Sequence, residues 1–110
     1  MQLADWLMDE ILAEHYHSDE RAPSVRDCAA RSQVNANTAV RAYEYLENAG
    51  IIYNRRGLGY FVSTDAAKII VETRRKEFFS NEMTYFFSRL RSMGMTADDL
   101  ARHYTDYLKQ

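Results

Sequence analysis

A short run of polar and basic residues has the chemistry needed to read the edges of DNA bases. Within residues 35–41, amide, hydroxyl and guanidinium groups lie within two turns of a possible helix. Asparagine can pair bidentately with adenine, arginine can do so with guanine, and an apolar side chain can contact a thymine methyl. We expect such contacts from Asn37, Val40 and Arg41, with Thr38 reaching a base or a phosphate. An isolated exposed valine is also common on protein surfaces, which is the simpler interpretation of Val40.

A second set of residues has the chemistry needed to hold phosphates. The set is Ser24, Arg26, Asn35, Arg55, Arg56 and Gly57. Arg26 supplies positive charge, and the free amides of the helical patterns that follow Ser24 and Asn35 attract anions. Arg55, Arg56 and Gly57 suit contact with a phosphate or with the minor groove, and the glycine lets the backbone come close to a surface. Each residue alone is weak evidence, but the ordered set predicts a reader of duplex DNA.

Two short capped helices must position these groups. Ser24, followed three residues later by an aspartate, is a capping-box-like pattern and predicts a helix over 25–31. A three-residue turn follows. Asn35 is a favourable N-cap for a second helix over 36–48, which a glycine then ends.

A β-hairpin follows the second helix. Residues 51–54 and 60–63 are rich in β-branched and aromatic side chains, and the basic, glycine-bearing segment 55–59 joins them. An amphipathic helix over 2–14 precedes the whole arrangement. This order of elements predicts a helix-turn-helix with a wing.

The apolar faces of the three helices predict one hydrophobic core. Its expected members are Leu3, Leu7, Met8, Ile11, Leu12, Val25, Cys28, Ala29, Ala39, Ala42, Tyr43 and Leu46. The single cysteine excludes an intrachain disulfide, which favours a reducing, cytoplasmic setting. We expect Cys28 to be buried and inert rather than a redox sensor.

The distribution of charge supports a nucleic-acid partner, although the net charge is −2. Residues 1–20 carry six acidic side chains and no Lys or Arg. Residues 21–62 carry six arginines against three acidic residues, giving +3, and residues 63–110 carry +1. The positive charge therefore lies in the expected reading segment, where it can steer DNA. Ordinary solvated charge remains the simpler alternative.

The C-terminal part has a different character. Residues 66–93 contain neither Pro nor Gly and predict a helical stripe, and a second capping box from Thr96 opens a helix over 97–109. The apolar surface of these helices has no evident partner in so short a chain, so we expect self-association. The residues expected on this dimerisation surface are Phe79, Met83, Phe86, Phe87, Leu90, Tyr104 and Tyr107. The alternative is that the helix pair folds back on the first helix as core.

These patterns predict a mostly α-helical protein with a small β-hairpin: a winged helix-turn-helix over 1–63 and a two-helix dimerisation or effector region over 64–110. Enzymatic interpretations fail, because no phosphate-binding loop or nucleophile–base spacing is present. His15 and His17 form only an isolated pair, so we expect no metal and no other cofactor. No apolar run is long enough to span a membrane.

Four motifs resemble the winged helix-turn-helix of the GntR family of bacterial transcription regulators. The sequence has Pro-Ser-Val-Arg at 23–26, Asn-Ala-Asn-Thr at 35–38, Leu-Glu-Asn-Ala-Gly at 46–50 and Arg-Gly-Leu-Gly-Tyr-Phe-Val at 56–62. The Asn-x-Asn-Thr variant, followed by Ala42 and Tyr43, resembles the YtrA-like branch, which has a short two-helix C-terminal region. Departures from the family pattern are Ala22, Cys28 and Ala36, which bear on operator sequence rather than on fold.

The resemblance implies a cytoplasmic, nucleoid-associated homodimer that binds a palindromic operator in double-stranded DNA, as a repressor. It implies DNA contacts from Arg26, Asn35, Asn37, Thr38, Arg41 and Gly57. Two other interpretations stay open. One is a winged-helix protein-interaction module without specific DNA binding. The other is a sensor that binds a small-molecule effector between Phe78, Phe86, Tyr104 and Tyr107.

Overall fold

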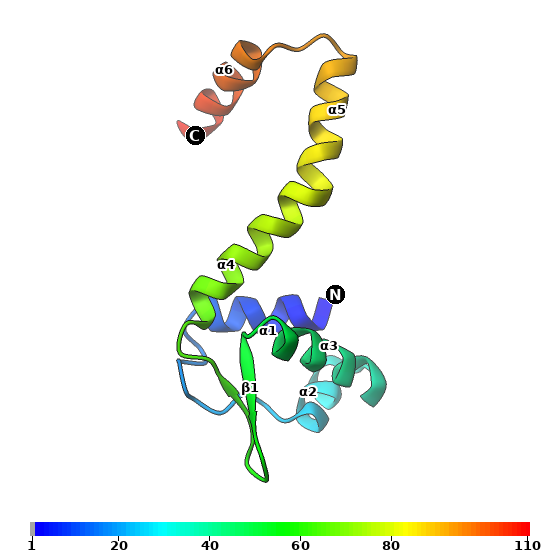
Figure 1. The fold of residues 1–110 in the computed structure, drawn as a ribbon, viewed down its shortest axis with the longest axis vertical. Coiled ribbons are helices and arrows are strands. Elements are labelled where there is room, and N and C mark those ends of the chain that lie inside the picture. Colours follow the sequence, from blue (N-terminus) through cyan, green and yellow to red (C-terminus); the bar gives the residue numbers. More distant parts are fainter. Residues whose placement is uncertain (1) are drawn as a thin grey trace. The chain divides into compact units, whose positions relative to one another are not determined.

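The computed structural model describes residues 2–110, and the chain is mostly helical. The order of elements is α1 (Gln2–Leu12), α2 (Val25–Ser32), α3 (Ala36–Asn48), β1 (Ile52–Arg55), β2 (Gly59–Val62), α4 (Ala66–Glu77), a π-helical segment η1 (Phe78–Met83), α5 (Thr84–Ser92) and α6 (Ala97–Leu108) (Figure 1). The predicted winged helix-turn-helix followed by C-terminal helices is confirmed. The chain divides into two compact units, Met1–Thr73 and Arg74–Gln110.

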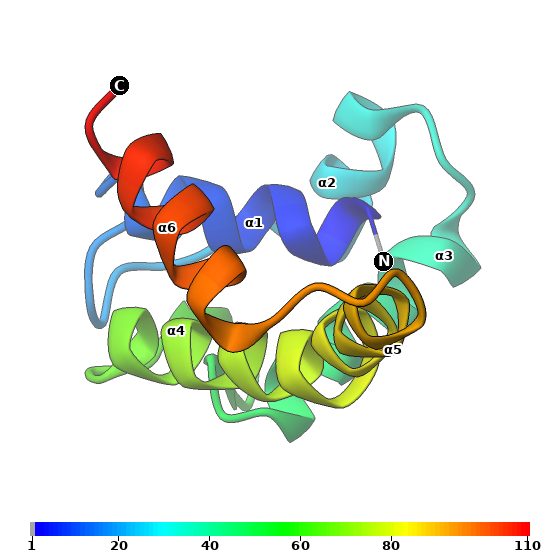
Figure 2. The same cartoon turned by 90° about the horizontal axis from the view of Figure 1, so that it is seen from above.

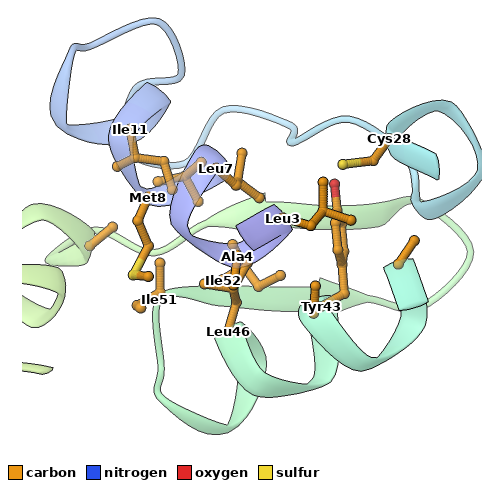
Figure 3. Packing of buried hydrophobic residues seen from close by; sticks show 14 of the residues in the cluster. Leu3, Ala4, Leu7, Met8, Ile11, Cys28, Tyr43, Leu46, Ile51 and Ile52 are labelled. Carbon is orange, nitrogen blue, oxygen red and sulfur yellow. The ribbon is translucent and has the colours of Figure 1, made fainter. Parts of the chain in front are cut away.

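The core of the first unit lies between α1, α3 and the hairpin, with α2 closing one end (Figures 2 and 3). Leu7, Leu46 and Ile52 are almost completely buried, as are Ala39 and Ala42 on the inner face of α3. Full burial of one large aliphatic side chain is worth about 1.5–3 kcal/mol. The small alanines let α3 approach its neighbours closely, as the sequence predicted.

Two details of the first unit differ from the prediction. The first helix ends at Leu12 instead of residue 14, and Leu12 is 38% exposed instead of buried. The reason is that Glu14 adopts φ +64°, so the chain turns away before another helical turn can cover the core. The strands begin and end one residue away from the predicted ranges, with Ile52 paired to Val62 and Arg55 to Gly59.

The loop before α2 pairs with the outer edge of the hairpin. The Ala22 amide donates to the Tyr60 carbonyl at 2.9 Å, and the Val62 amide donates to the Glu20 carbonyl at 2.9 Å. Arg21 and Phe61 form an antiparallel bridge between these bonds. Strand β2 therefore has a partner on both sides, which ties the stem of the wing to the start of the helix-turn-helix.

The segment predicted as a helical stripe, 66–93, is helical from Ala66 to Ser92, and it contains the π-helical segment η1. The Thr84 hydroxyl donates to the Phe79 carbonyl at 3.0 Å, which satisfies an acceptor at this change in hydrogen-bond pattern. Gly94, at φ +72°, follows α5, and the chain turns back toward α6 (Figure 1). The predicted capping box is confirmed: Thr96 accepts from the Asp99 amide, and Asp99 accepts from the Thr96 amide.

Candidate nucleic-acid interface

Helix α2 begins as the sequence predicted. The Ser24 hydroxyl oxygen accepts from the Asp27 amide at 3.0 Å, which satisfies one of the free amides of the first turn. Arg26 follows in that turn and is exposed. Cys28 and Ala29 point inward and are buried, while Val25 is partly buried against the core. The outer side of this helix start is therefore polar, with the exposed Arg26 guanidinium next to the exposed Asp27 carboxylate.

The turn between α2 and α3 is fixed by backbone geometry. Gln33 adopts the left-handed conformation at φ +54°, and its amide donates to carbonyls of the last turn of α2. Asn35 then caps α3, because its side-chain oxygen accepts from the Thr38 amide at 2.9 Å. The Thr38 hydroxyl donates to the same oxygen at 3.1 Å. These two expected DNA-contact residues therefore already serve to start the helix, and the Asn35 side-chain NH₂ group still has donors to offer.

Helix α3 has one buried face and one exposed polar face. Ala39, Ala42, Tyr43 and Leu46 are buried. Asn37 and Arg41, four residues apart, lie on the exposed side together with Val40, whose side chain is 40% exposed. The structure therefore brings the residues expected to read bases onto one surface of one helix.

Tyr43 links α3 to both neighbouring parts of the interface. Its hydroxyl donates to the Pro23 carbonyl at 2.5 Å, just before α2, and its ring meets the Tyr60 ring of the wing edge-on, with centroids 5.2 Å apart. The hydroxyl also lies beside the Cys28 thiol (Figure 3). Burial, and then the neighbouring Cys28, raise the pKa of Tyr43, and burial raises the pKa of Cys28. Both groups therefore stay protonated and neutral.

Sequence reasoning placed Tyr43 in the core but missed this positioning role. The available signal was a tyrosine on a helix face otherwise made of alanine and leucine, because a buried tyrosine hydroxyl usually finds a hydrogen-bond partner. Its partner, the Pro23 carbonyl, is a backbone group 20 residues away in the chain. No local pattern identifies such a partner.

The wing presents its two arginines differently. The Arg55 guanidinium lies over the Phe61 ring, 5.1 Å from its centroid, while Arg56 is exposed at the tip. Gly57 adopts φ +80° in the turn, a conformation that favours glycine. Tyr53 and Phe61 stack with centroids 5.9 Å apart and stiffen the stem. Arg55 is thus fixed on the stem, whereas Arg56 and Gly57 belong to the turn of the hairpin, which extends away from the helices of the first unit (Figure 1).

Other candidate sites have little support in the described part of the chain. Residues 2–110 contain no cluster of three or more metal-ligating side chains. His15 pairs with Glu10, and Cys28 is completely buried as predicted. Among the same residues, no helix has both the length and the apolar character needed to cross a bilayer.

The second unit carries an apolar groove of about 710 Å³ between the η1–α5 segment and α6. Its lining includes Phe78, Phe86 and Tyr104, three of the four residues expected around an effector, but not Tyr107. The side chains expected for dimerisation are exposed, apart from Met83 and Leu90, which are partly buried. The residues that line the groove are Phe78, Met83, Phe86, Phe87, Ala97, Leu100, Ala101, His103 and Tyr104.

Known proteins place this arrangement in one family. No family model matches the sequence. A solved structure from Bacteroides thetaiotaomicron, described as a transcriptional regulator of the GntR family, is 37% identical with a TM-score of 0.87, and the match covers 98% of this chain and 94% of that one. The chain belongs to the GntR family of transcription regulators.

Two further relatives agree with this assignment. The helix-turn-helix transcriptional regulator Rv1152 of Mycobacterium tuberculosis is 34% identical over 108 residues, which is 94% of this chain and 80% of the relative. The transcriptional repressor YtrA of Bacillus subtilis is 42% identical over 53 residues, which is 48% of this chain and 41% of YtrA. The predicted family is therefore confirmed, with YtrA among the relatives of this GntR-family regulator. These relatives are regulators, so the prediction that the protein is not an enzyme is also confirmed.

Proposed function

We propose that this regulator binds a specific site in double-stranded DNA, with α3 in the major groove. The observation that carries the proposal is the division of α3 into a buried apolar face and an exposed face with Asn37, Val40 and Arg41. In helix-turn-helix proteins the second helix enters the major groove and presents its N-terminal residues to the bases. Asn37 and Arg41 then read adenine and guanine, and Val40 contacts a thymine methyl.

The start of α2 and the wing hold the DNA backbone on either side of α3. Arg26 and the first turn of α2 contact phosphates, and Arg55, Arg56 and Gly57 of the wing contact phosphates or the minor groove. Residues 21–62 have a net charge of +3, although the whole chain has a net charge of −2. The positive charge is therefore concentrated in the segment that forms the interface. Such local charge steers association with DNA.

We infer that the protein acts as a homodimer through its second unit, residues 74–110. Phe79, Phe87 and Tyr107 are between 48% and 66% exposed in the single chain. Exposed aromatic surface beside an apolar groove is typical of an interface with another chain. A second copy is the simplest occupant, since α6 also exposes Tyr107 and Leu108, which do not line the groove. A two-fold dimer would bind a palindromic operator.

Repression by occupying a promoter is the mode of action we favour, because YtrA, one of the relatives, is described as a repressor. Such a protein acts in the cytoplasm, at the nucleoid. A small-molecule effector that bound in the groove lined by Phe78 and Phe86 would compete with the second copy for the same apolar surface.

The DNA-binding proposal is tested by selecting a random duplex pool with the purified protein at about 0.15 M salt. We expect enrichment of a two-fold symmetric sequence. Arg41→Ala should weaken binding to that sequence by about 1–3 kcal/mol and relax one base position in each half-site. A uniform loss on all sequences would instead make Arg41 a phosphate contact. If nothing is enriched, the protein-interaction module becomes the better interpretation.

Dimerisation is tested separately by sedimentation. Phe86→Glu places a charge on the apolar groove and should convert the dimer to a monomer at micromolar concentration. Ser88→Glu is the matched control, because two residues further along a helix lies about 200° around its axis, away from Phe86. A wild-type monomer, or equal effects of the two variants, would contradict dimerisation through this groove.

A further inference from the structure

We propose that Arg21, in the loop before α2, is an additional contact to the DNA backbone that joins the phosphate-holding start of α2 to the wing. This proposal rests on the proposed DNA-binding function. Neither the helix-turn-helix pattern nor the turn signals of the wing single out this residue, because it lies outside every helix and strand.

The backbone of Arg21 is fixed at the edge of the wing. Arg21 pairs with Phe61 in an antiparallel bridge, and hydrogen bonds of 2.9 Å from Ala22 and Val62 hold the loop on either side. In an antiparallel pair, directly opposed residues project on the same face of the sheet. Arg21 therefore lies on the same face as Phe61.

The same face carries Arg55. Tyr53 is paired with Phe61 and Arg55 with Gly59, two residues before Phe61. The alternation of side chains puts Tyr53, Arg55, Phe61 and Arg21 on one face. Because the order across the sheet is loop, β2, β1, the two arginines approach Phe61 from opposite edges. The opposite face carries Val62, which is buried in the core.

Gly59 leaves room for the Arg21 side chain to lie along the wing. A Cβ atom built on Gly59 would be 3.4 Å from Nε and 3.5 Å from one terminal nitrogen of the Arg21 guanidinium. This contact agrees with the face assigned from strand pairing. The guanidinium is thus held against the stem of the wing, and an arginine held in place loses less freedom when it binds a phosphate.

The Arg21 guanidinium is available to a DNA phosphate. No carboxylate forms an ion pair with it among residues 2–110. An open hollow of about 500 Å³ is lined by Arg21 and by Ser24 at the start of α2, and its lining also includes Asp27 and Arg31. Arg21 therefore stands between the phosphate contacts proposed for α2 and for the wing, and a DNA strand that touches both passes it.

The test measures binding of fluorescein-labelled duplexes by anisotropy at several salt concentrations. The probes are the duplex enriched from the random pool and a scrambled duplex of the same composition. The variants are Arg21→Ala, Arg21→Lys and, as the matched loss of one exposed positive charge elsewhere in the first unit, Lys68→Ala. Circular dichroism melting establishes that each variant is folded.

For Arg21→Ala we expect the slope of log K against log salt to fall by about 0.9 per protomer, because one phosphate contact is lost. If the variant and the wild type bind equally at about 1 M salt, this difference in slope makes the variant bind both duplexes about 5-fold more weakly per protomer at about 0.15 M salt. Arg21→Lys should keep most of the slope, and Lys68→Ala should leave it unchanged.

Three results would overturn the assignment. An unchanged slope for Arg21→Ala, with wild-type protein binding normally, refutes the Arg21 contact and leaves the proposed function intact. A loss confined to the enriched duplex makes Arg21 a base contact instead of a backbone contact. If the wild-type protein binds neither duplex, the proposed function itself is wrong and the Arg21 contact falls with it.

Discussion

Replacing Tyr43 with phenylalanine removes one hydroxyl from the point where α2, α3 and the wing meet. That hydroxyl donates to the Pro23 carbonyl at 2.5 Å and is nearly inaccessible to solvent, since Tyr43 is 1% exposed. The phenylalanine ring can still pack against Tyr60. The Pro23 carbonyl loses this donor, and an acceptor left unsatisfied near the core costs about 1–3 kcal/mol.

The expected loss is measurable in unfolding experiments. In a unit the size of Met1–Thr73, 1 kcal/mol corresponds to about 4–8 °C in Tm. We therefore expect Tyr43→Phe to lower Tm by at least about 4 °C, and to lower the urea midpoint without a change in the m-value. Circular dichroism at 222 nm follows both transitions, because this unit is mainly helical.

Tyr60→Phe is the matched control, since it removes a hydroxyl from the other ring of the same pair. Among residues 2–110, no hydrogen bond of the Tyr60 hydroxyl is present, and the residue is only partly buried. We expect a change within about 0.5 kcal/mol. Equal stability of Tyr43→Phe and wild type, or an equal loss in both variants, would refute the reasoning that the Tyr43 hydroxyl holds the interface together.

The pKa shifts predict weaker stability in alkali. Folding raises the pKa of Cys28 and Tyr43 above their ordinary values of 9.0 and 10.0, so the unfolded chain loses these protons first and stability falls as pH rises past those values. Each group lowers the free energy of unfolding by up to about 1.4 kcal/mol for each pH unit above its ordinary pKa. Urea midpoints measured between pH 8 and 11 should therefore fall less steeply above pH 10 for Tyr43→Phe than for the wild type. Asn35→Ala removes the cap of α3 and should cost about 0.5–2 kcal/mol in urea unfolding. Asn37→Ala, which caps nothing, should cost less than about 0.5 kcal/mol, and equal losses would contradict the capping role. Leu46→Ala opens a cavity at a completely buried position and should cost about 2–5 kcal/mol by the same assay, whereas a loss below 1 kcal/mol would mean that the core relaxes to fill it.

The predictions that succeeded rest on local chemistry. Ser24, Asn35 and Thr96 cap helices because a side-chain oxygen reaches an amide three residues later, and this geometry needs no other part of the chain. The hairpin is likewise signalled by Gly57 and Gly59 between two β-prone segments. The motif order that places the protein in its family is built from such local signals.

The prediction for Leu12 was wrong, and the π-helical segment lies beyond what residue types predict. Leu12 fits the apolar period of α1, but the helix ends there and the side chain stays exposed. Residues 66–93 contain no helix breaker, yet the hydrogen bonds change pattern at η1. A π turn changes which carbonyl accepts each amide hydrogen bond, while the segment stays helical. No residue type requires this change, so the sequence does not predict it.

The sequence alone determined the order of elements, their caps, the polar face of α3 and the family, since each depends on residues within a few positions of one another. Only the tertiary structure decided how those elements are joined. Tyr43 reaches Pro23, Arg21 lies along Gly59, and Phe86 lines a groove with residues of α6. The physical reason is that these contacts join residues between 11 and 38 positions apart, or depend on which side of a strand a side chain takes. Periodicity along the chain carries no record of either.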